Sequence, residues 1–361
     1  MERQGELLGN RAAVGRVAIA DRSKPVAVWL FATAFVVFGL VVVGGATRLT
    51  GSGLSITEWK PIMGVVPPLS AADWESAFAK YRQTTQYHDL NQGMSLAGFQ
   101  AIYWWEWTHR LLGRLVGVVF AGPLIGFLAL GQVPRRLIWR VVGLLGLGGL
   151  QGLVGWWMVV SGLEGRVAVA PERLAVHLGL ALLLFVALIW TGLEAWFGRG
   201  QPAAHRGWRR AATGLAALVY LQCLLGALVA GNQAGLVDND WPLMDGRLLP
   251  SDYWVGGLWR SLLHGQAAVQ FNHRLVAYAV VVLAVGLAGV AAFRGQFLSK
   301  AQREVALAVG ALVAAQAALG IATLMARAPL PLSQAHQALA TIVLAAAAIQ
   351  AWRANRSARV L

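Results

Sequence analysis

The chain of 361 residues is 57% hydrophobic and only 13% charged, with a mean hydropathy of +0.58 and a net charge of +14. This composition excludes an ordinary soluble domain and predicts an integral membrane protein. The positive charge does not predict nucleic-acid binding, because it is spread over short loops rather than gathered with aromatic residues on one soluble surface.

Eight apolar stretches are long enough to cross a bilayer as helices, which takes about 20 residues each. They cover residues 26–47, 104–130, 138–161, 172–197, 209–231, 268–292, 303–326 and 332–352. The apolar run after the polar first 24 residues is too long for a signal-peptide core, so we expect the N-terminal segment to be retained. The sequence therefore predicts an all-α integral membrane fold with no separate soluble domain.

The distribution of charge predicts which side of the membrane each loop faces. Basic residues gather before the first stretch, after the second, fourth and sixth stretches, and at the C-terminus: Arg3, Arg11, Arg16, Arg22, Lys24, Arg135, Arg136, Arg140, Arg199, Arg206, Arg209, Arg210, Arg294, Lys300, Arg303, Arg353, Arg356 and Arg359. The alternate loops hold most of the acidic residues: Glu58, Asp73, Glu75, Asp89, Glu164, Asp238, Asp240, Asp245 and Asp252. We therefore expect both termini in the cytoplasm of a bacterium, a location in its inner (plasma) membrane, and long outer loops at 48–103 and 232–267 that cover the periplasmic side.

The chain contains an internal repeat of about half its length. Residues 106–111, EWTHRL, correspond to residues 270–275, QFNHRL, and the loop segment 58–64 corresponds to 240–246. Gln151 and Gly155 recur with the same spacing as Gln316 and Gly320. Each half, 1–200 and 201–361, holds four stretches and enters from the same side. We therefore expect two tandem four-helix bundles related by a pseudo-two-fold axis along the membrane normal.

Four histidines lie at similar depths near the outer ends of the even-numbered stretches: His109, His177, His273 and His336. A single histidine on an apolar helix can be a satisfied core residue, but polar groups inside a membrane are costly and usually functional. Two imidazoles that face each other across a bundle can ligate a heme iron from both sides. Structural zinc would require four protein ligands, and Cys223 is the only cysteine. The pattern predicts one bis-histidine heme site in each bundle.

Charged residues beside these histidines differ between the halves. Arg110 and Arg274 follow the first histidine of each half, where a guanidinium can bind heme propionates or extend to the membrane interface. Glu106 lies one turn before His109, whereas Gln270 occupies the equivalent position of the second half. A carboxylate there can accept a proton or orient a water molecule, or form an interfacial ion pair with Arg110. The difference predicts a working site in the first bundle and an electron-handling site in the second.

Three segments, together with the duplicated histidine pairs, resemble the heme A synthase family over essentially the whole chain. They are residues 44–55 (GGATRLTGSGLS), 58–61 (EWKP) and 106–114 (EWTHRLLGR). The resemblance implies that a ring methyl group of heme O is oxidised in two steps to the formyl group of heme A, which serves cytochrome oxidase. The chain lacks the cysteine pair that some members carry in an outer loop.

The resemblance also implies roles for individual residues. The N-terminal bundle, residues 1–200, would hold heme O on His109 and His177, with Glu106 as the catalytic carboxylate. The C-terminal bundle, residues 201–361, would hold one permanent heme b on His273 and His336. Heme O synthase and a membrane electron acceptor are the implied partners, and the large apolar surface is compatible with a homo-oligomer. Nothing in the sequence assigns a role to the other histidines, which are His88, His205 and His264.

Two mechanisms and two other functions are consistent with parts of this pattern. An iron held by two histidines has no open position for oxygen, so either one histidine dissociates, or electrons leave the heme while Glu106 accepts a methyl proton and water supplies the oxygen. We favour the second mechanism. A di-heme, quinol-linked electron carrier would also use two histidine pairs but would not need Glu106. A secondary transporter would place intramembrane charges near the midplane, whereas here they lie near one face.

Overall fold

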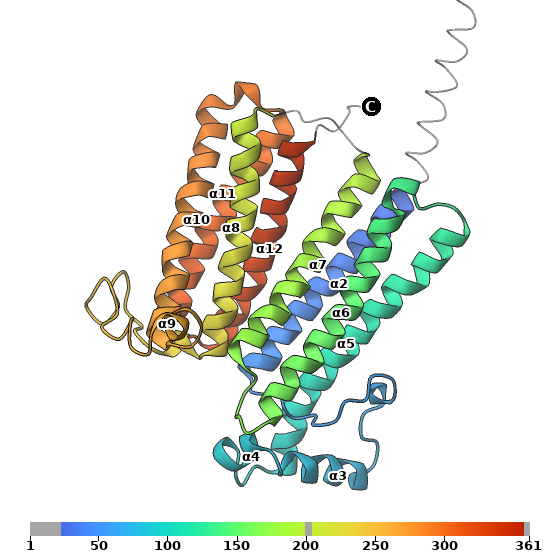
Figure 1. Ribbon diagram of the computed structural model, residues 1–361, viewed down its shortest axis with the longest axis vertical. Helices are drawn as coiled ribbons and strands as arrows, with labels where there is room; N and C mark the ends of the chain where they lie inside the picture. Colours follow the sequence, from blue (N-terminus) through green and yellow to red (C-terminus); the bar gives the residue numbers. More distant parts are fainter. Residues whose placement is uncertain (1–22, 199–203, 357–361) are drawn as a thin grey trace, which may run out of the picture.

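The computed structural model describes residues 23–198 and 204–356, which form helices and loops (Figure 1). Eight helices are long and apolar enough to span a membrane: α2 (Lys24–Leu49), α5 (Leu96–Ala129), α6 (Ile138–Leu163), α7 (Pro171–Phe197), α8 (Arg206–Gly231), α10 (Gln266–Arg294), α11 (Lys300–Met325) and α12 (Leu330–Asn355). The predicted all-α membrane architecture and its eight spans are confirmed. Six charges used to predict topology lie outside the described residues: Arg3, Arg11, Arg16, Arg22, Arg199 and Arg359. The predicted boundary between residues 200 and 201 lies outside them as well.

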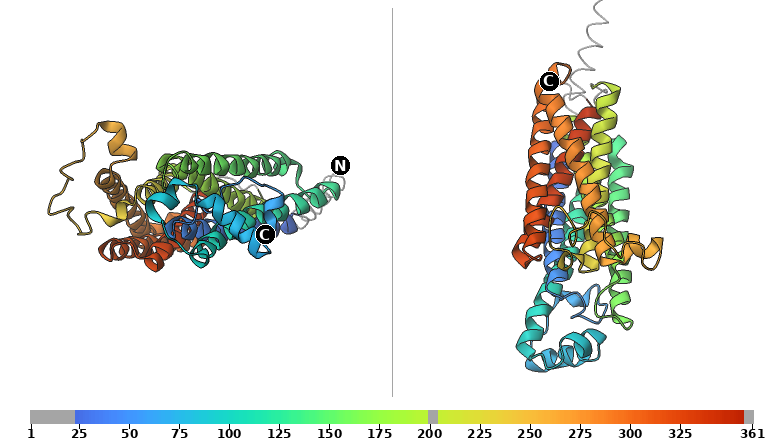
Figure 2. Two further views of the ribbon diagram at one scale, coloured as in Figure 1. Left: turned by 90° about the horizontal axis from the view of Figure 1, so that it is seen from below. Right: turned by 90° about the vertical axis from the view of Figure 1, so that its left-hand side faces the viewer.

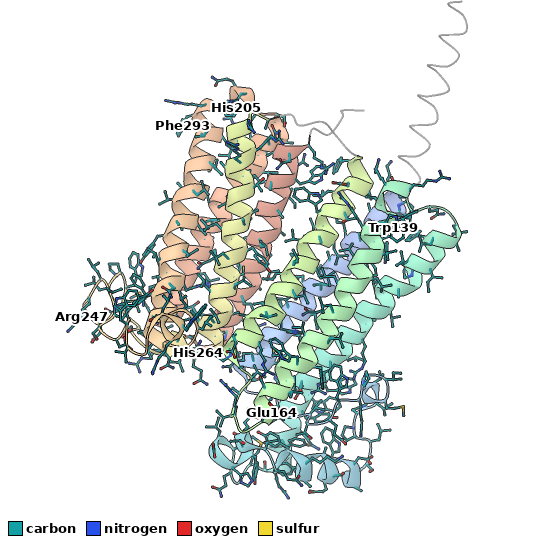
Figure 3. All side chains as sticks on the ribbon, viewed as in Figure 1. Trp139, Glu164, His205, Arg247, His264 and Phe293 are labelled. Atoms are coloured by element: carbon teal, nitrogen blue, oxygen red, sulfur yellow. The ribbon has the colours of Figure 1, made fainter. Side chains whose placement is uncertain are left out.

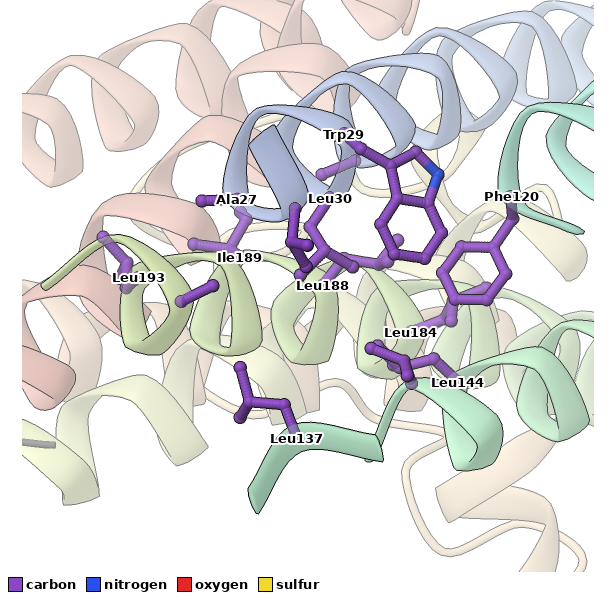
Figure 4. Close-up of a cluster of buried hydrophobic side chains, with 14 of the residues drawn as sticks. Ala27, Trp29, Leu30, Phe120, Leu137, Leu144, Leu184, Leu188, Ile189 and Leu193 are labelled. Atoms are coloured by element: carbon purple, nitrogen blue, oxygen red, sulfur yellow. The ribbon is translucent and has the colours of Figure 1, made fainter. Parts of the chain in front are cut away.

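The long helices form two groups that lie side by side (Figure 1). Helix α2 packs against α5 and α7, and α6 packs against α7, whereas α8, α10, α11 and α12 each pack against two others of their own group. Contacts of α7 with α8 and of α2 with α12 join the groups. A buried cluster that includes Trp29, Leu30, Phe120 and Leu188 fills the first group (Figure 4). The pseudo-two-fold axis and the division into two domains stay predictions.

The first outer loop contains two short helices that lie beyond the ends of the long ones (Figure 2). They are α3 (Ala71–Tyr81) and α4 (Thr85–Leu90), and a reciprocal capping box between Ser70 and Asp73 begins α3. The Gln86 amide nitrogen donates to the carbonyl oxygens of Gly51, at 3.0 Å, and Val167, at 3.2 Å. This side chain connects the first outer loop to the loop between α6 and α7.

Helix α5 begins eight residues before the predicted start at residue 104. Its first turns lie outside the apolar stretch and pack Phe99 and Tyr103 against Phe78 and Tyr81 in a buried aromatic cluster. The Ser95 hydroxyl accepts a hydrogen bond from the Gly98 amide and caps the helix. Hydropathy did not reveal this extension because aromatic packing in the outer loop, rather than lipid, stabilises it.

Helices α2 and α12 approach each other closely at one glycine. The Gln337 amide nitrogen donates to the Val41 carbonyl at 2.8 Å, and Gln334 donates to the carbonyl of Val42. A Cβ atom added to Gly45 would lie 1.8 Å from Oε1 of Gln337, so no larger residue fits without a shift. Side-chain amides of one bundle therefore bind backbone carbonyls of the other.

A buried carboxylate stabilises the opposite end of the molecule from α3 and α4. Glu194 near the end of α7 is 1% exposed and accepts from Arg140 at 2.7 Å and from Arg356 at 2.6 Å. The indole of Trp190 also donates to Glu194 at 3.2 Å. This network connects α6 and α7 to the residue that follows α12.

We expect Glu194→Gln to lower the stability of the folded protein by about 3 kcal/mol, because removing one partner of a buried ion pair leaves the other charges uncompensated. The melting temperature of the purified protein in detergent measures this effect. Glu304→Gln is the matched control, since Glu304 is 61% exposed and its nitrogen partner on Lys300 is 3.9 Å away. Equal melting temperatures for the two variants would contradict the assigned role of Glu194.

Candidate functional site

Each of the four predicted histidines packs its ring on a glycine of a neighbouring helix. A Cβ atom added to Gly44 would lie 2.7 Å from Cε1 of His109, and one added to Gly155 would lie 3.0 Å from Cε1 of His177. In the second bundle, a Cβ atom added to Gly226 would lie 3.3 Å from Cε1 of His273, and one added to Gly320 would lie 2.7 Å from Cε1 of His336. The glycines lie on α2, α6, α8 and α11, and the histidines lie on α5, α7, α10 and α12. A larger side chain would press on the imidazole ring at each of these positions, most severely at Gly44 and Gly320.

The structure brings the histidines together in the predicted pairs. His109 and His177 lie close enough for their charges to interact, as do His273 and His336. His177 and His336 are within about two turns of the first residues of their helices, Pro171 and Leu330. Both pairs therefore lie toward the end of the molecule that carries the long loops.

The other histidines lie at helix ends or in the outer loop. His205 caps the start of α8 by accepting from the Gly207 amide at 3.1 Å, and His264 follows the short helix α9 (Leu258–Leu263) at the opposite end of the same bundle (Figure 3). His88 lies on α4. None of them joins a histidine pair.

Three of the four rings also contact a glutamine that lies one turn before the glycine. The amide nitrogen of Gln151 lies 3.2 Å from Nδ1 of His177. The amide nitrogen of Gln316 lies 3.1 Å from Nδ1 of His336, and that of Gln222 lies 3.0 Å from Nδ1 of His273. Oε1 of each glutamine is buried and has no hydrogen-bond partner among the described residues. The sequence analysis singled out Gln151 and Gln316 but missed Gln222, although Gln222 and Gly226 show the same four-residue spacing.

The carboxylate of Glu106 is buried in a set of four hydrogen bonds. Glu106 is 3% exposed, and its Oε2 accepts from the Ser55 hydroxyl at 2.7 Å and from the Ile56 amide at 2.8 Å. Its Oε1 accepts from Nη2 and Nε of Arg110 at 2.6 and 3.0 Å. The ion pair with Arg110 that the sequence allowed is present, and Glu106 lies one turn before His109 on α5.

The second bundle has a neutral copy of this arrangement. Gln270 is 3% exposed and accepts from Arg274 at 2.6 Å through Oε1, while its amide nitrogen donates to the carbonyls of Ala234, at 2.7 Å, and Val237, at 2.6 Å. The loop contributes carbonyl acceptors here, whereas it contributes the donors Ser55 and Ile56 to the carboxylate in the first bundle. The loop of the first site therefore suits a negatively charged carboxylate, whereas the loop of the second site suits a neutral amide.

The two arginines bind the outer loops. Arg110 donates to the carbonyls of Ile56, at 2.7 Å, and Glu58, at 2.9 Å, and Arg274 donates to those of Asp238, at 2.7 Å, and Leu243, at 2.9 Å. Both arginines thus hold a loop over a histidine pair. Their predicted contact with heme propionates stays a prediction, because most of these donors are engaged by the protein itself.

The Glu58 side chain points to a different set of partners. Lys80 and Lys60 donate to its carboxylate at 2.8 and 3.1 Å, and both hydrogen bonds lower the pKa of this exposed outer-loop group. The Glu58 backbone carbonyl therefore binds Arg110 at the site, whereas its carboxylate forms ion pairs within the loop. Unlike Glu106, Glu58 does not place its carboxylate in the site.

The donor set of each pair fits a heme. Among the described residues no three histidine, cysteine, aspartate or glutamate side chains gather to hold a metal ion by themselves. A heme iron needs only two axial ligands from the protein, and paired imidazoles supply them. The buried glutamine oxygens beside three of the rings offer acceptors for the N–H that a ligating imidazole keeps. The glycine contacts, paired rings and unpartnered acceptors therefore fit a bis-histidine heme in each bundle.

We expect Gly320→Ala to lower the heme content of the purified protein, because the new methyl group would lie 2.7 Å from Cε1 of His336. The reduced-minus-oxidised spectrum per mole of protein measures the loss. Gly289→Ala on α10 is the matched control, since nothing lies within 4 Å of a Cβ atom added there. A full heme complement in Gly320→Ala would argue against a ligand role for His336 in its present position.

Comparison with known proteins identifies the family. Residues 27–348 match the cytochrome oxidase assembly protein family. Heme A synthase of Caulobacter vibrioides is 58% identical over 337 residues, which cover 93% of this chain and 98% of the relative. Heme A synthases of Mesorhizobium japonicum, over 91% of this chain and 90% of the relative, and of Azorhizobium caulinodans, over 96% and 98%, are each 47% identical. The chain, with its eight apolar helices, therefore belongs to the cytochrome oxidase assembly protein family of multi-pass membrane proteins.

Proposed function

We propose that this chain is a heme A synthase of a bacterial inner membrane, which oxidises the ring methyl group of heme O to a formyl group. His109 and His177 bind the substrate heme O, and His273 and His336 bind one resident heme b. Close relatives that carry the name heme A synthase over nearly their whole length support this assignment. The termini face the cytoplasm and the histidine pairs lie toward the periplasmic side.

The observation that carries the proposal is the difference between Glu106 and Gln270. A protein that only moved electrons between two hemes would have no use for a carboxylate at one of two equivalent positions. The buried carboxylate is the group in the first site that can accept a proton from a substrate carbon. The asymmetry thus favours an enzyme over a di-heme electron carrier.

In this proposal each residue has a limited task. The heme b, when bound, supplies a one-electron redox centre beside the substrate site. Glu106 accepts a proton from the methyl group at one of its carboxylate oxygens, and Arg110 stabilises the charge of that carboxylate beforehand. Ser55 and Ile56 hold the carboxylate in place. The outer loop held by Arg110 limits the access of bulk water. Each of the two oxidations removes two electrons, which pass to an acceptor in the membrane, and a water molecule forms the new C–O bond at the oxidised carbon; loss of water from the resulting hydrated aldehyde leaves the formyl group.

Chromatography of hemes extracted from the purified protein tests the function. The chain is expressed with heme O synthase in a host that makes no heme A of its own. We expect heme A together with heme b from the wild type. Heme b alone, with heme O present in the membranes but absent from the protein, would support the electron-carrier function instead.

The origin of the formyl oxygen distinguishes the two mechanisms, in which the oxygen comes either from water or from oxygen gas. We expect label from isotopic water, and none from oxygen gas, once exchange of the finished aldehyde with water has been measured separately. Label that comes from oxygen gas would instead require one histidine to leave the iron.

A further inference from the structure

Three of the four ring environments share a glutamine that the fourth lacks. On α6, α8 and α11 the residue one turn before the ring-bearing glycine is a glutamine, whereas on α2 it is Leu40, four residues before Gly44. Nδ1 of His109 is buried, and no side chain among the described residues forms a hydrogen bond with it. His109 is therefore the ring that no glutamine side chain holds.

The backbone does not account for this difference. His109 faces the backbone carbonyl of Leu40, and His273 faces that of Gln222 in the same way. The two histidines occupy equivalent places in the repeat, on α5 and α10, and both pack on a glycine. On the glycine-bearing helices, the side chain at position 40 or 222 distinguishes the two rings, because a leucine has no polar atom to offer an imidazole.

A glutamine at this place can fix a ligating imidazole. When Nε2 binds iron, Nδ1 keeps its hydrogen and requires an acceptor. Nε2 of Gln222 lies 3.0 Å from Nδ1 of His273 and makes no other hydrogen bond than those to this ring, while its Oε1 has no partner. A half-turn of the carboxamide exchanges the two atoms and offers Oε1 to the Nδ1 hydrogen without breaking another hydrogen bond.

We propose that Gln222 is a positioning residue that keeps His273 on the iron of the resident heme, and that Leu40 makes His109 the ligand that releases the exchanging heme. The inference rests on the proposed function, in which one heme stays and the other must leave as product. Removal of an outer partner of a metal ligand typically weakens metal binding about 10- to 100-fold. The C-terminal bundle has a glutamine beside both of its ligands, and the N-terminal bundle has one beside His177 alone.

Three variants of the full-length protein test this inference. Gln222→Met keeps the volume of the side chain but removes the acceptor, Gln222→Glu keeps an acceptor, and Leu40→Gln adds the missing side chain beside His109. The readouts are the rate at which each heme passes to excess apomyoglobin and the binding of carbon monoxide to the reduced protein. Heme b is distinguished from hemes O and A by chromatography, so the two sites are followed separately.

We expect Gln222→Met to lose heme b about 10- to 100-fold faster than the wild type and to bind carbon monoxide, because His273 leaves the iron more often. Gln222→Glu should retain heme b and should not bind carbon monoxide. The midpoint potential of its heme b should be lower than in the wild type. Leu40→Gln should slow the loss of heme A by about 10-fold or more. If Gln222→Glu retains heme b while Gln222→Met loses it, the loss results from the missing hydrogen bond and not from a folding defect.

Heme b retained at the wild-type rate in Gln222→Met, with no carbon monoxide binding, would overturn the role of Gln222. An unchanged rate of heme A loss in Leu40→Gln would overturn the role of Leu40. His273→Ala separates these failures from a failure of the proposed function. If His273→Ala loses heme b but Gln222→Met does not, only the present inference is wrong; if His273→Ala keeps heme b with an unchanged spectrum, the ligand assignment itself is wrong.

Discussion

Glu106→Gln should lower heme A formation by at least about 100-fold while the protein still binds heme O, because it removes the proton acceptor of the first bundle but keeps its shape. The amide oxygen can still accept a hydrogen bond from Arg110, as Gln270 does from Arg274 in the second bundle, and only the hydrogen bond from the Ile56 amide must be lost, because the Ser55 hydroxyl can turn to accept from the new amide nitrogen. The folded structure is therefore expected to survive. Extraction and chromatography of bound hemes measures both quantities in one experiment.

Glu164→Gln provides the matched control for this variant. Glu164 is an exposed acid at the outer end of α6 (Figure 3), and it makes no ion pair with another described residue. We expect it to form heme A at the wild-type rate. Heme A from Glu106→Gln at a rate similar to that of this control would remove the carboxylate from the reaction and leave it a structural partner of Arg110.

His336→Ala should abolish the low-spin spectrum of the resident heme and remove most of that heme from the purified protein, because one of its two axial ligands is lost. His109→Ala should leave the resident heme in place and affect only the binding of heme O. The reduced-minus-oxidised spectrum and the extracted heme b per mole of protein report the result. His264→Ala is a suitable control, since His264 lies at the end of α9 and outside both pairs.

The opposite pattern would be informative as well. If His109→Ala removed heme b and His336→Ala did not, the resident heme would belong to the first bundle and the roles of the two bundles would be exchanged. Equal loss of heme b in both variants would mean that one heme depends on both bundles, contrary to the assignment of one heme to each.

The long helices and the histidine pairs could be predicted because hydropathy and an internal repeat both act over many residues. The predicted spans agree with seven of the eight helices to within about three residues at either end. The exception is α5, where Phe99 and Tyr103 extend the helix into the outer aromatic cluster. This extension depends on contacts with α3. Hydropathy assigns the residues of α3 to a loop and therefore does not predict those contacts.

The partners of the arginines could not be predicted in the same way. Arg140 was counted as a sign of a cytoplasmic loop and Arg356 as a sign of a cytoplasmic C-terminus, but both also bind the buried Glu194. Arg110 was predicted to contact either propionates or Glu106, and the sequence contained no sign that the carbonyls of Ile56 and Glu58 would receive its remaining donors. Backbone acceptors carry no residue-type signal, so only the folded loop reveals them.

The role of Gln222 illustrates the opposite case, in which the signal was present and was not used. Its spacing to Gly226 is the same as that of Gln151 to Gly155 and of Gln316 to Gly320. An alignment of the odd-numbered spans on their glycines would have revealed three glutamines and Leu40. A comparison of the halves conceals this pattern, because it pairs the first span with the fifth, where Leu40 lies opposite Gln222.

The contact between Gly45 and Gln337 bears on why two similar halves remain in a single polypeptide. If the halves were separate proteins, the amides of Gln334 and Gln337 would face lipid without the carbonyls of α2. Unsatisfied polar groups in hydrocarbon cost several kcal/mol each, so lone halves would be poorly inserted and would associate at once. A gene split between residues 200 and 201 is thus expected to yield a working protein only when both fragments are made together in the same membrane.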